Sequence, residues 1–336
     1  MSTKFVLRNI IRLKTRSIYK VIDNQNSWDS HLNILNYPEA HKDILFWRDN
    51  INDLNKRNII ENTFSSITSF SDASSTGIGA ICESNNLVCH KNFNLEERNK
   101  SSTWRELEAI RFSLKAFSKS IQNNSIKWLT DNKAAMFITK TGSRKNELQK
   151  LSLEIFNLTK TLNINLDVQW IQRDSNKAAD YLSKIVDPDD WELTDSFFKY
   201  LEKMWGPFTI DRFANHNNAK VTRFNSKYFV PGTEAIDAFT QDWSLENNLL
   251  VPPTKLILRT IRYIENSKVK GVLVVPYWPA SSFWSKLQIN EQFSYFIQES
   301  FISFDTRNIL KQGNFKESLL GSENYKGGIA AFKIRS

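Results

Sequence analysis

The pattern of apolar and polar positions predicts a run of short strands that begins near residue 66. Apolar and β-branched residues occupy three short stretches, at residues 67–73, 78–83 and 87–92, and Gly77 and Asn85-Asn86 separate them. Consecutive short strands joined by tight turns are typical of an antiparallel meander. This part of the chain is therefore expected to begin a β-sheet.

A helical period follows these strands. Leu107, Ile110, Leu114 and Phe117 recur at helical spacing, which predicts a helix over residues 103–121. The next segments read as a strand at 126–131, helices at 132–139 and 146–162, a strand at 164–171 and a helix at 176–184. The order βββαβαβα indicates an α/β fold in which a five-stranded mixed sheet carries flanking helices.

The stretch before this domain, residues 1–65, has a helical pattern of its own. Val6, Ile10, Leu13 and Ile18 fit one face of an amphipathic helix, and residues 38–47 fit a second helix with Pro38 near its start. The first 22 residues hold six basic side chains and no acid, so a transit peptide is the alternative interpretation.

The stretch after it, residues 187–336, is expected to form a second α/β domain. It opens with Asp187-Pro-Asp-Asp-Trp-Glu, which is typical of a linker, and a helix is predicted over residues 194–205. Apolar runs at residues 256–264 and 272–279 then alternate with loops. The chain is thus divided into segments 1–65, 66–186 and 187–336.

Composition and charge narrow the class of protein. The 336 residues are 40% hydrophobic, which excludes a disordered or low-complexity chain. Cys82 and Cys89 are too few for a disulfide scaffold and favour a reducing, intracellular compartment, nuclear or cytoplasmic. No apolar run reaches the roughly 18 residues of a membrane span, so no membrane partner is expected. The net charge of +9 divides into +3, +5 and +1 over the three segments, which favours an anionic partner for the first two.

Four acids in the middle segment are candidates for a metal site. Asp72 ends the first predicted strand, Asp131 ends the fourth, and Glu106 and Asp180 lie in helices that pack on the sheet. Adjacent strand ends share one edge of a sheet, where crowded carboxylates repel one another unless cations bind. Oxygen ligands suit Mg²⁺, and two such ions roughly 4 Å apart activate a water for phosphodiester cleavage.

Each acid alone also fits a structural role. Glu106 follows Thr103 at capping-box spacing, Asp131 precedes a helix as an N-cap would, and Asp180 lies in the first turns of its helix. Asp72 precedes a turn. Taken together, in this order and on these elements, the four acids favour the metal site.

Four motifs in residues 66–186 carry a resemblance to a known family. They resemble the motifs of type 1 ribonuclease H, most closely the version in DIRS and Ngaro retrotransposons, which encode a tyrosine recombinase. The resemblance implies hydrolysis of the RNA strand of RNA–DNA hybrids with two Mg²⁺ or Mn²⁺ ions, and it makes Asp72, Glu106, Asp131 and Asp180 the metal-binding acids. The motifs are Ser71-Asp-Ala-Ser-Ser-Thr-Gly-Ile-Gly-Ala80, Thr103-Trp-Arg-Glu-Leu-Glu-Ala109, Leu129-Thr-Asp-Asn-Lys-Ala-Ala135 and Asn176-Lys-Ala-Ala-Asp-Tyr-Leu-Ser183.

One departure from the ribonuclease H pattern is a missing histidine. Many ribonucleases H carry a histidine before the last acid, whereas residues 170–180 contain none.

The first segment carries a resemblance of its own. Residues 1–65 resemble the thumb or connection of a reverse transcriptase, notably at Asp43-Ile-Leu-Phe-Trp47, which allows association with a reverse transcriptase. No Tyr-X-Asp-Asp sequence occurs, so polymerase activity is not expected.

Five motifs of the last segment are Phe208-Thr-Ile-Asp-Arg-Phe-Ala214, Ile236-Asp-Ala-Phe239, Asp242-Trp243, Val251-Pro-Pro-Thr254 and Val275-Pro-Tyr-Trp278. They resemble the module that follows ribonuclease H in DIRS-type elements. That module is similar to phage DNA adenine-N6 methyltransferases, which use S-adenosylmethionine. Their catalytic motif is Asp or Asn, then Pro-Pro, then an aromatic residue that stacks on the flipped base. Here the segment reads Val251-Pro-Pro-Thr254, and neither outer residue can do that chemistry. The domain is therefore expected to be inactive, with Asp211 and Asp237 left either as remnants of a cofactor pocket or as turn acids.

Three functions remain at this point. The preferred one is a retrotransposon-derived ribonuclease H, an endonuclease that cuts the RNA of RNA–DNA hybrids. The first alternative is a non-catalytic nucleic-acid-binding relic of a retrotransposon polyprotein. The second alternative is a DNA adenine-N6 methyltransferase. The sequence leaves the oligomeric state open.

Overall fold

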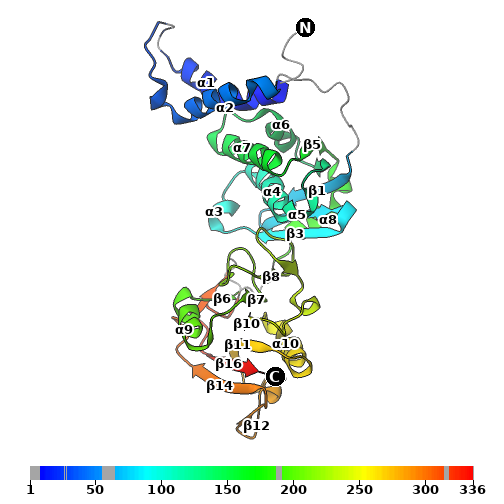
Figure 1. The fold of residues 1–336 in the computed structure, drawn as a ribbon, viewed down its shortest axis with the longest axis vertical. Coiled ribbons are helices and arrows are strands. Elements are labelled where there is room, and N and C mark those ends of the chain that lie inside the picture. Colours follow the sequence, from blue (N-terminus) through cyan, green and yellow to red (C-terminus); the bar gives the residue numbers. More distant parts are fainter. Residues whose placement is uncertain are drawn as a thin grey trace. The chain divides into compact units, whose positions relative to one another are not determined.

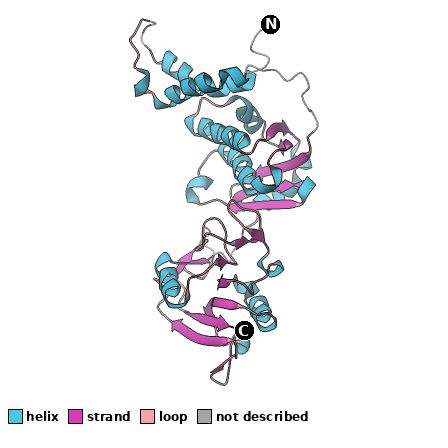
Figure 2. Cartoon of the chain, viewed as in Figure 1, coloured by secondary structure: helices cyan, strands magenta, loops and turns pink. Residues whose placement is uncertain are grey.

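The computed structural model describes residues 8–25, 27, 29–54, 65–186, 191–313 and 318–335. Within this part of the chain the fold is mixed α/β (Figures 1 and 2), as predicted. The chain forms two compact units, residues 1–87 with 99–184 and residues 88–98 with 185–336. Residues 187–190 of the predicted linker lie outside the described residues.

The first sheet has five strands in the order β3-β2-β1-β4-β5. β1 pairs antiparallel with β2 and parallel with β4, and β4 pairs parallel with β5, so the sheet is mixed. The strands are β1 (Ile67–Ala73), β2 (Gly77–Cys82), β3 (Leu87–Asn92), β4 (Ser125–Thr130) and β5 (Asn165–Trp170). The predicted mixed sheet is confirmed, and the bounds of β1 and β3 match the predicted strands.

Six helices accompany this sheet among the described residues. Apolar side chains of α4 and of the strands form the core, with Leu107, Ile110 and Trp128 fully buried. The helix predicted over residues 103–121 is divided in two at Phe117, which caps the first part. The helices are α3 (Leu95–Arg98), α4 (Ser102–Ala116), α5 (Ser118–Ile121), α6 (Lys133–Thr141), α7 (Asn146–Thr161) and α8 (Lys177–Ser183).

Two helices precede the sheet and belong to the same compact unit. α1 (Arg8–Asp23) and α2 (Pro38–Leu54) lie side by side (Figure 1), and the indole Nε1 of Trp47 donates to the carbonyl oxygen of Lys14 at 3.0 Å. α1 also contacts α6 and α7, because the Arg16 guanidinium donates to the carbonyl oxygens of Thr141 and Gly142 at 2.9 and 3.1 Å. The N-terminal helices thus pack against the first α/β fold through α1.

The second unit is built on a sheet with the order β14-β16-β11-β10-β7. β7, β10 and β11 are parallel, whereas β16 runs antiparallel to both β11 and β14. The sheet strands are β7 (Ile210–Asp211), β10 (Asn247–Leu250), β11 (Lys270–Tyr277), β14 (Ile297–Ser303) and β16 (Gly328–Arg335). The helices are α9 (Asp195–Trp205) and α10 (Ile257–Asn266), and short pairs join β6 (Trp191–Leu193) to β15 (Leu310–Gln312), β8 (Asn225–Ser226) to β9 (Ala235–Ile236), and β12 (Gln288–Ile289) to β13 (Gln292–Phe293).

Aromatic side chains fill the interior of the second unit. Two clusters of buried residues include the indoles of Trp243 and Trp284 in one and those of Trp191 and Trp205 in the other. Trp243 and Trp284 are buried, at 1% and 5% exposure. Over the described ranges, no helix has the length and apolar character that crossing a bilayer requires.

Candidate metal centre

The four candidate acids come from two strands and two helices of the first unit. Asp72 is the second-last residue of β1 and pairs with Gly79 of β2. Asp131 directly follows β4, which runs parallel to β1. Both acids therefore reach the same edge of the sheet. Glu106 comes from α4 and Asp180 from α8.

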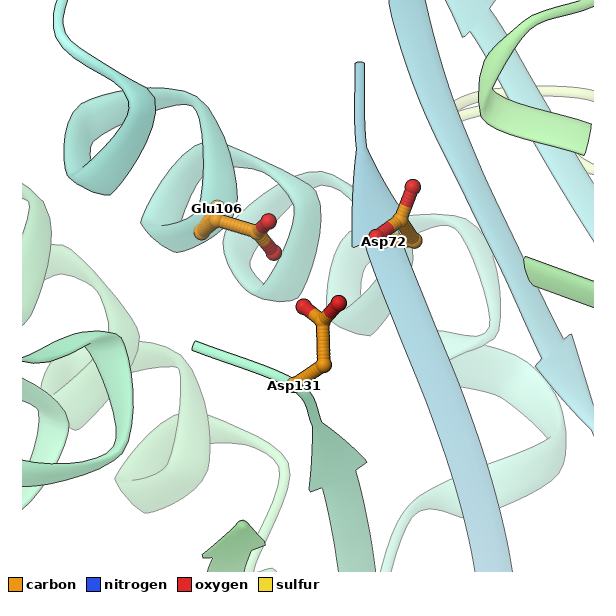
Figure 3. Close-up of side chains that lie close together, drawn as sticks. All are labelled: Asp72, Glu106 and Asp131. Carbon is orange, nitrogen blue, oxygen red and sulfur yellow. The ribbon is translucent and has the colours of Figure 1, made fainter. Parts of the chain in front are cut away.

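Three of the four carboxylates meet. Asp72, Glu106 and Asp131 each offer an oxygen, and these oxygens all lie within 4.8 Å of one another (Figure 3). Asp72 and Glu106 are buried, at 4% and 5% exposure, while Asp131 is half-buried. Asp180 does not belong to this group. We name Asp72, Glu106 and Asp131 the acidic triad.

Two structural alternatives for these acids are wrong. The N-cap of α4 is Ser101, whose side chain accepts from the backbone N–H of Trp104, so Glu106 does not form the predicted capping box. The N-cap of α6 is Asn132, which accepts from the backbone N–H of Ala135 at 2.9 Å. Helix capping therefore explains neither Glu106 nor Asp131.

The electrostatics of the triad favour a bound cation. Burial, followed by the charges of Asp72 and Asp131, raises the pKa of Glu106 well above its ordinary value. Burial also raises the pKa of Asp72, and the charges of Asp131 and Asp180 add to that rise. Glu106 Oε2 is buried and has no hydrogen-bond partner among the described residues. An oxygen without a partner, beside two further carboxylates, fits a hard divalent cation.

Asp180 has a different environment. Its Oδ2 accepts from Lys184 Nζ at 2.6 Å, and its Oδ1 lies 3.2 Å from Arg173 Nη2. The hydrogen bond from Lys184 and then that from Arg173 lower the pKa of Asp180. Asp180 is nevertheless near enough for its charge to raise the pKa of Asp72. Its place as a fourth metal ligand stays a prediction.

The packing of α8 on β2 brings a further polar group to the triad. Ser183 Oγ donates to Asp72 Oδ2 at 2.6 Å, in a buried position. α8 can approach because residue 79 is glycine: a methyl group there would lie 2.5 Å from Leu182 Cβ and from Ser183 N. Sequence reasoning missed Ser183, although it ends the fourth motif three residues after Asp180.

Two tryptophans donate hydrogen bonds to residues at or beside the triad. Trp128 Nε1 donates to the hydroxyl of Ser71 at 2.9 Å, and Trp170 Nε1 donates to the carbonyl oxygen of Asp131 at 2.9 Å. Asn176 Nδ2 adds a bond to the carbonyl oxygen of Ser71 at 3.0 Å. The sequence analysis did not predict these bonds, which depend on side-chain direction.

The candidate residues of the second unit lie at strand ends and in turns. Val251 follows β10, and a short 3-10 helix begins at Thr254. The carboxylate of Asp211 accepts from the backbone N–H groups of Phe213 and Lys220, at 3.4 and 3.2 Å. Asp237, with a φ of 52°, accepts from the N–H of Phe239 at 3.1 Å. Both acids thus have the turn geometry that the sequence left open, although Asp237 and Val251 also line a cavity of about 420 Å³.

Two families match the two parts of the chain. A family described as reverse transcriptase-like matches residues 64–186. A family described as DNA N-6-adenine-methyltransferase (Dam) matches residues 182–333. A search of curated proteins found no match. The chain therefore combines an α/β domain with a five-stranded mixed sheet, which is similar to the reverse transcriptase-like family, and a second α/β domain, which is similar to the adenine methyltransferase family.

Several solved structures are similar to parts of the chain. Ribonuclease H1 from Halobacterium salinarum NRC-1 is 14% identical over 34% of this chain and 92% of its own, with a TM-score of 0.31. LC11-RNase H1, solved in complex with an RNA/DNA hybrid, is 17% identical over 35% of this chain and 93% of its own, with a TM-score of 0.29. The protease–reverse transcriptase of prototype foamy virus is 13% identical over 56% of this chain and 28% of its own, with a TM-score of 0.26.

Proposed function

We propose that the first unit is a ribonuclease H that cuts the RNA strand of RNA–DNA hybrids with divalent cations held at the acidic triad. One observation carries this proposal: three carboxylates offer oxygens within 4.8 Å of one another, and the buried Glu106 Oε2 has no hydrogen-bond partner among the described residues. The match of residues 64–186 to the reverse transcriptase-like family supports it.

The chain's own residues would bind the divalent cations and orient the carboxylates that hold them. Asp72, Glu106 and Asp131 would supply oxygen ligands for Mg²⁺ or Mn²⁺, and Ser183 would orient Asp72 through its 2.6 Å hydrogen bond. When bound, two such ions supply Lewis acidity for the attacking water and for the leaving oxygen. We retain Asp180 as the fourth ligand, for which an ion would compete with Arg173 and Lys184.

Residues outside the triad would have to attract the nucleic-acid substrate. Carboxylates repel phosphates, so the basic excess of residues 1–186 would attract the nucleic-acid backbone. Contacts with 2′-hydroxyl groups across the minor groove would distinguish the RNA strand from DNA. Cleavage that leaves a 3′-hydroxyl and a 5′-phosphate is the expected outcome.

The direct test uses the full chain, a hybrid labelled on its RNA strand, and Mg²⁺. The wild type should cut the RNA, and Asp131→Asn should slow cleavage by roughly 100-fold or more, because it removes one carboxylate from the cation site. Asp174→Asn is the matched control, since it makes the same change at an exposed acid outside the triad. Equal rates for the wild type and Asp131→Asn would refute the assignment.

A relic that binds hybrid without cutting it is the competing proposal. It would be favoured if the wild type bound the hybrid but showed no cleavage with either Mg²⁺ or Mn²⁺. We also propose an origin in a DIRS-type retrotransposon, an intracellular location and association with a reverse transcriptase, on the strength of the four motifs in residues 66–186. Co-purification with a reverse transcriptase of such an element would test that association.

For the second unit we propose a methyltransferase-like domain without methyl transfer. Its support is the match of residues 182–333 to the adenine methyltransferase family, together with the side chains of Val251 and Thr254 around the Pro-Pro pair. Valine cannot accept a hydrogen bond from an adenine amino group, and threonine offers no ring to stack on it. Transfer of a labelled methyl group from S-adenosylmethionine to DNA would refute this proposal.

A further inference from the structure

The second unit holds a cavity beyond the carboxyl ends of two parallel strands. The cavity measures about 420 Å³, and all the residues that line it belong to this unit. Residues 212–218, which follow β7, contribute to its wall, as do residues between 251 and 256, which lead from β10 into α10. In open α/β sheets, ligands bind beyond the carboxyl ends of parallel strands. The position of the cavity therefore indicates a ligand site.

Cations outnumber acids along the wall of this cavity. Asp237 is the acid among the residues that line it; it is exposed and accepts the backbone N–H of Phe239. The buried Arg212 guanidinium donates to uncharged acceptors, among them the side-chain oxygens of Asn248 and Asn225 at 2.7 and 2.9 Å. The cavity therefore favours an anion over a cation. Its cations are Lys91, which pairs with Glu97, and Arg212, Lys227, Lys255 and Arg259.

Two of these cations lie over aromatic rings. Arg259 Cζ lies 3.9 Å from the centroid of the Phe239 ring, and Lys227 Nζ lies 5.0 Å from the centroid of the Tyr228 ring. Both cations are exposed, so a ligand can reach them. A contact with an aromatic ring positions a cation without cancelling its charge. Lys227 and Arg259 therefore remain able to bind phosphate, which a guanidinium can hold through two parallel hydrogen bonds.

Aromatic side chains form another part of the wall. Phe213 and Phe239 both line the cavity, and their ring centroids lie 5.6 Å apart. Each ring also packs on the buried indole of Trp243, at 6.0 and 5.8 Å between centroids. Aromatic side chains accept nucleobases of any sequence, because every base has a π face. Rings and cations around one cavity thus match the base and the phosphates of a single nucleotide.

S-adenosylmethionine, the methyl donor that the resemblance to adenine methyltransferases implies, fits this wall poorly. It contains a nucleobase, but its sulfonium and ammonium groups give it a net positive charge. That charge would be repelled by Arg212, Lys227 and Arg259. A nucleoside phosphate contains the same kind of base and carries negative charge instead. The chemistry of the wall therefore favours the nucleoside phosphate.

We propose that this cavity binds a free nucleoside phosphate in place of S-adenosylmethionine, with its base against Phe213 and Phe239 and its phosphates at Lys227 and Arg259. The inference goes beyond the proposed absence of methyl transfer, because it assigns the second unit a ligand of a different chemical class. It does not depend on the nuclease proposed for the first unit.

The test measures binding of the full chain to N-methylanthraniloyl-ADP by fluorescence anisotropy, in EDTA so that no divalent cation links the phosphates to the acidic triad. Lys227→Gln/Arg259→Gln should weaken binding roughly tenfold or more, because it removes two charged phosphate contacts. The control pair Lys326→Gln/Arg262→Gln removes the same two kinds of side chain at exposed positions outside the cavity. Arg262 is a close match, since it lies on α10 three residues after Arg259.

Competition against the same probe identifies which parts of the ligand the wild type recognises. ADP should displace the probe roughly tenfold better than adenosine, which lacks the phosphates, and better than inorganic pyrophosphate, which lacks the base. Adenosine that competes as well as ADP would overturn the inference. A single-stranded oligonucleotide that displaces the probe at a lower concentration than ADP would identify a nucleic-acid strand as the ligand and overturn it too.

The outcomes separate this inference from the proposed function. If the wild type does not bind the probe, if Lys227→Gln/Arg259→Gln binds like the wild type, or if the control pair loses as much affinity, the nucleotide site is refuted. S-adenosylmethionine that binds more tightly than ADP without methyl transfer refutes this inference alone, whereas methyl transfer refutes the proposed function. Thermal unfolding detects a misfolded variant, and the competition experiment needs only the wild type.

Discussion

Both units bury carboxylates, but the surroundings of these carboxylates differ. In the first unit, burial and neighbouring acids raise the pKa of Glu106, and Glu106 Oε2 has no hydrogen-bond partner among the described residues. In the second unit, burial raises the pKa of Asp211 to about 6, yet both of its oxygens accept backbone N–H groups. The raised pKa values of Glu106 and Asp211 therefore both reflect burial. The carboxylate oxygen without a hydrogen-bond partner is what distinguishes the candidate site of the first unit from Asp211.

The largest expected difference between the two regions concerns cation binding. Glu106→Gln should weaken binding of Mn²⁺ by roughly 100-fold or more, since changes to groups that merely support a ligand already cost about 10–100-fold. Asp211→Asn, a matched acid-to-amide change at an equally buried site, should leave the affinity unchanged. Isothermal titration of the full chain with MnCl₂ measures both. Similar affinities in the two variants would remove the distinction between the two carboxylates.

The second prediction concerns the pH dependence of stability. At a pH below about 4, Asp211 is protonated in the folded and in the unfolded chain, so its contribution to stability is fully present. As the pH rises from 3.8 to about 6, the unfolded chain loses this proton first, and stability falls. The total loss is about 3 kcal/mol, at 1.36 kcal/mol for each pH unit.

Asp211→Asn should remove this loss because the amide does not titrate. Urea unfolding at a series of pH values between 4 and 7 would show it as a difference between the slopes of the two proteins. Parallel curves for the wild type and Asp211→Asn would mean that Asp211 is not the source of the pH dependence.

The third prediction tests the close approach of α8 to β2. Gly79→Ala should lower the free energy of unfolding by about 2 kcal/mol, because the new methyl group overlaps Leu182 and Ser183. Gly232→Ala in the second unit is the comparison. There the methyl group would lie 3.5 Å from the Phe224 ring, and the φ of 86° alone costs about 1 kcal/mol. Chemical denaturation measures both, and an equal loss would contradict the packing argument.

Part of the first unit could be predicted from the sequence alone. Periodicity placed β1 and β3 correctly, because alternation and turn residues are local signals. The motifs likewise selected Asp72, Glu106 and Asp131, whose carboxylate oxygens lie together, while their role as metal ligands stays a prediction. Local patterns contain no information on side-chain direction between distant elements, so the hydrogen bond of Ser183 was not predictable.

Two other features of the structure were also not predicted from the sequence. Asp180 was grouped with the triad through its helix and the fourth motif, which do not show that its carboxylate pairs with Arg173 and Lys184; its place as a metal ligand stays a prediction. In the second unit, β16 lies between β11 and β14, far from both in sequence, and no local pattern of residues 328–335 indicates these partners. For β16 the missing information was its long-range pairing, whereas the partners of Asp180 lie only seven and four residues away and depend on the fold of the surrounding loop and helix.

The smallest effect is expected from the hydroxyl group that orients Asp72. Ser183→Ala removes a buried hydrogen bond of 2.6 Å to the Asp72 carboxylate and should weaken Mn²⁺ binding about tenfold, because Asp72 loses the contact that orients it. Ser152→Ala is the matched control: its hydroxyl is also buried, but it donates to the backbone oxygen of Ile138 at 2.7 Å, outside the triad. Both changes should cost similar stability, about 1 kcal/mol. If Ser183→Ala lowers only the stability, as Ser152→Ala should, the hydroxyl group serves packing and the triad is oriented by its strands alone.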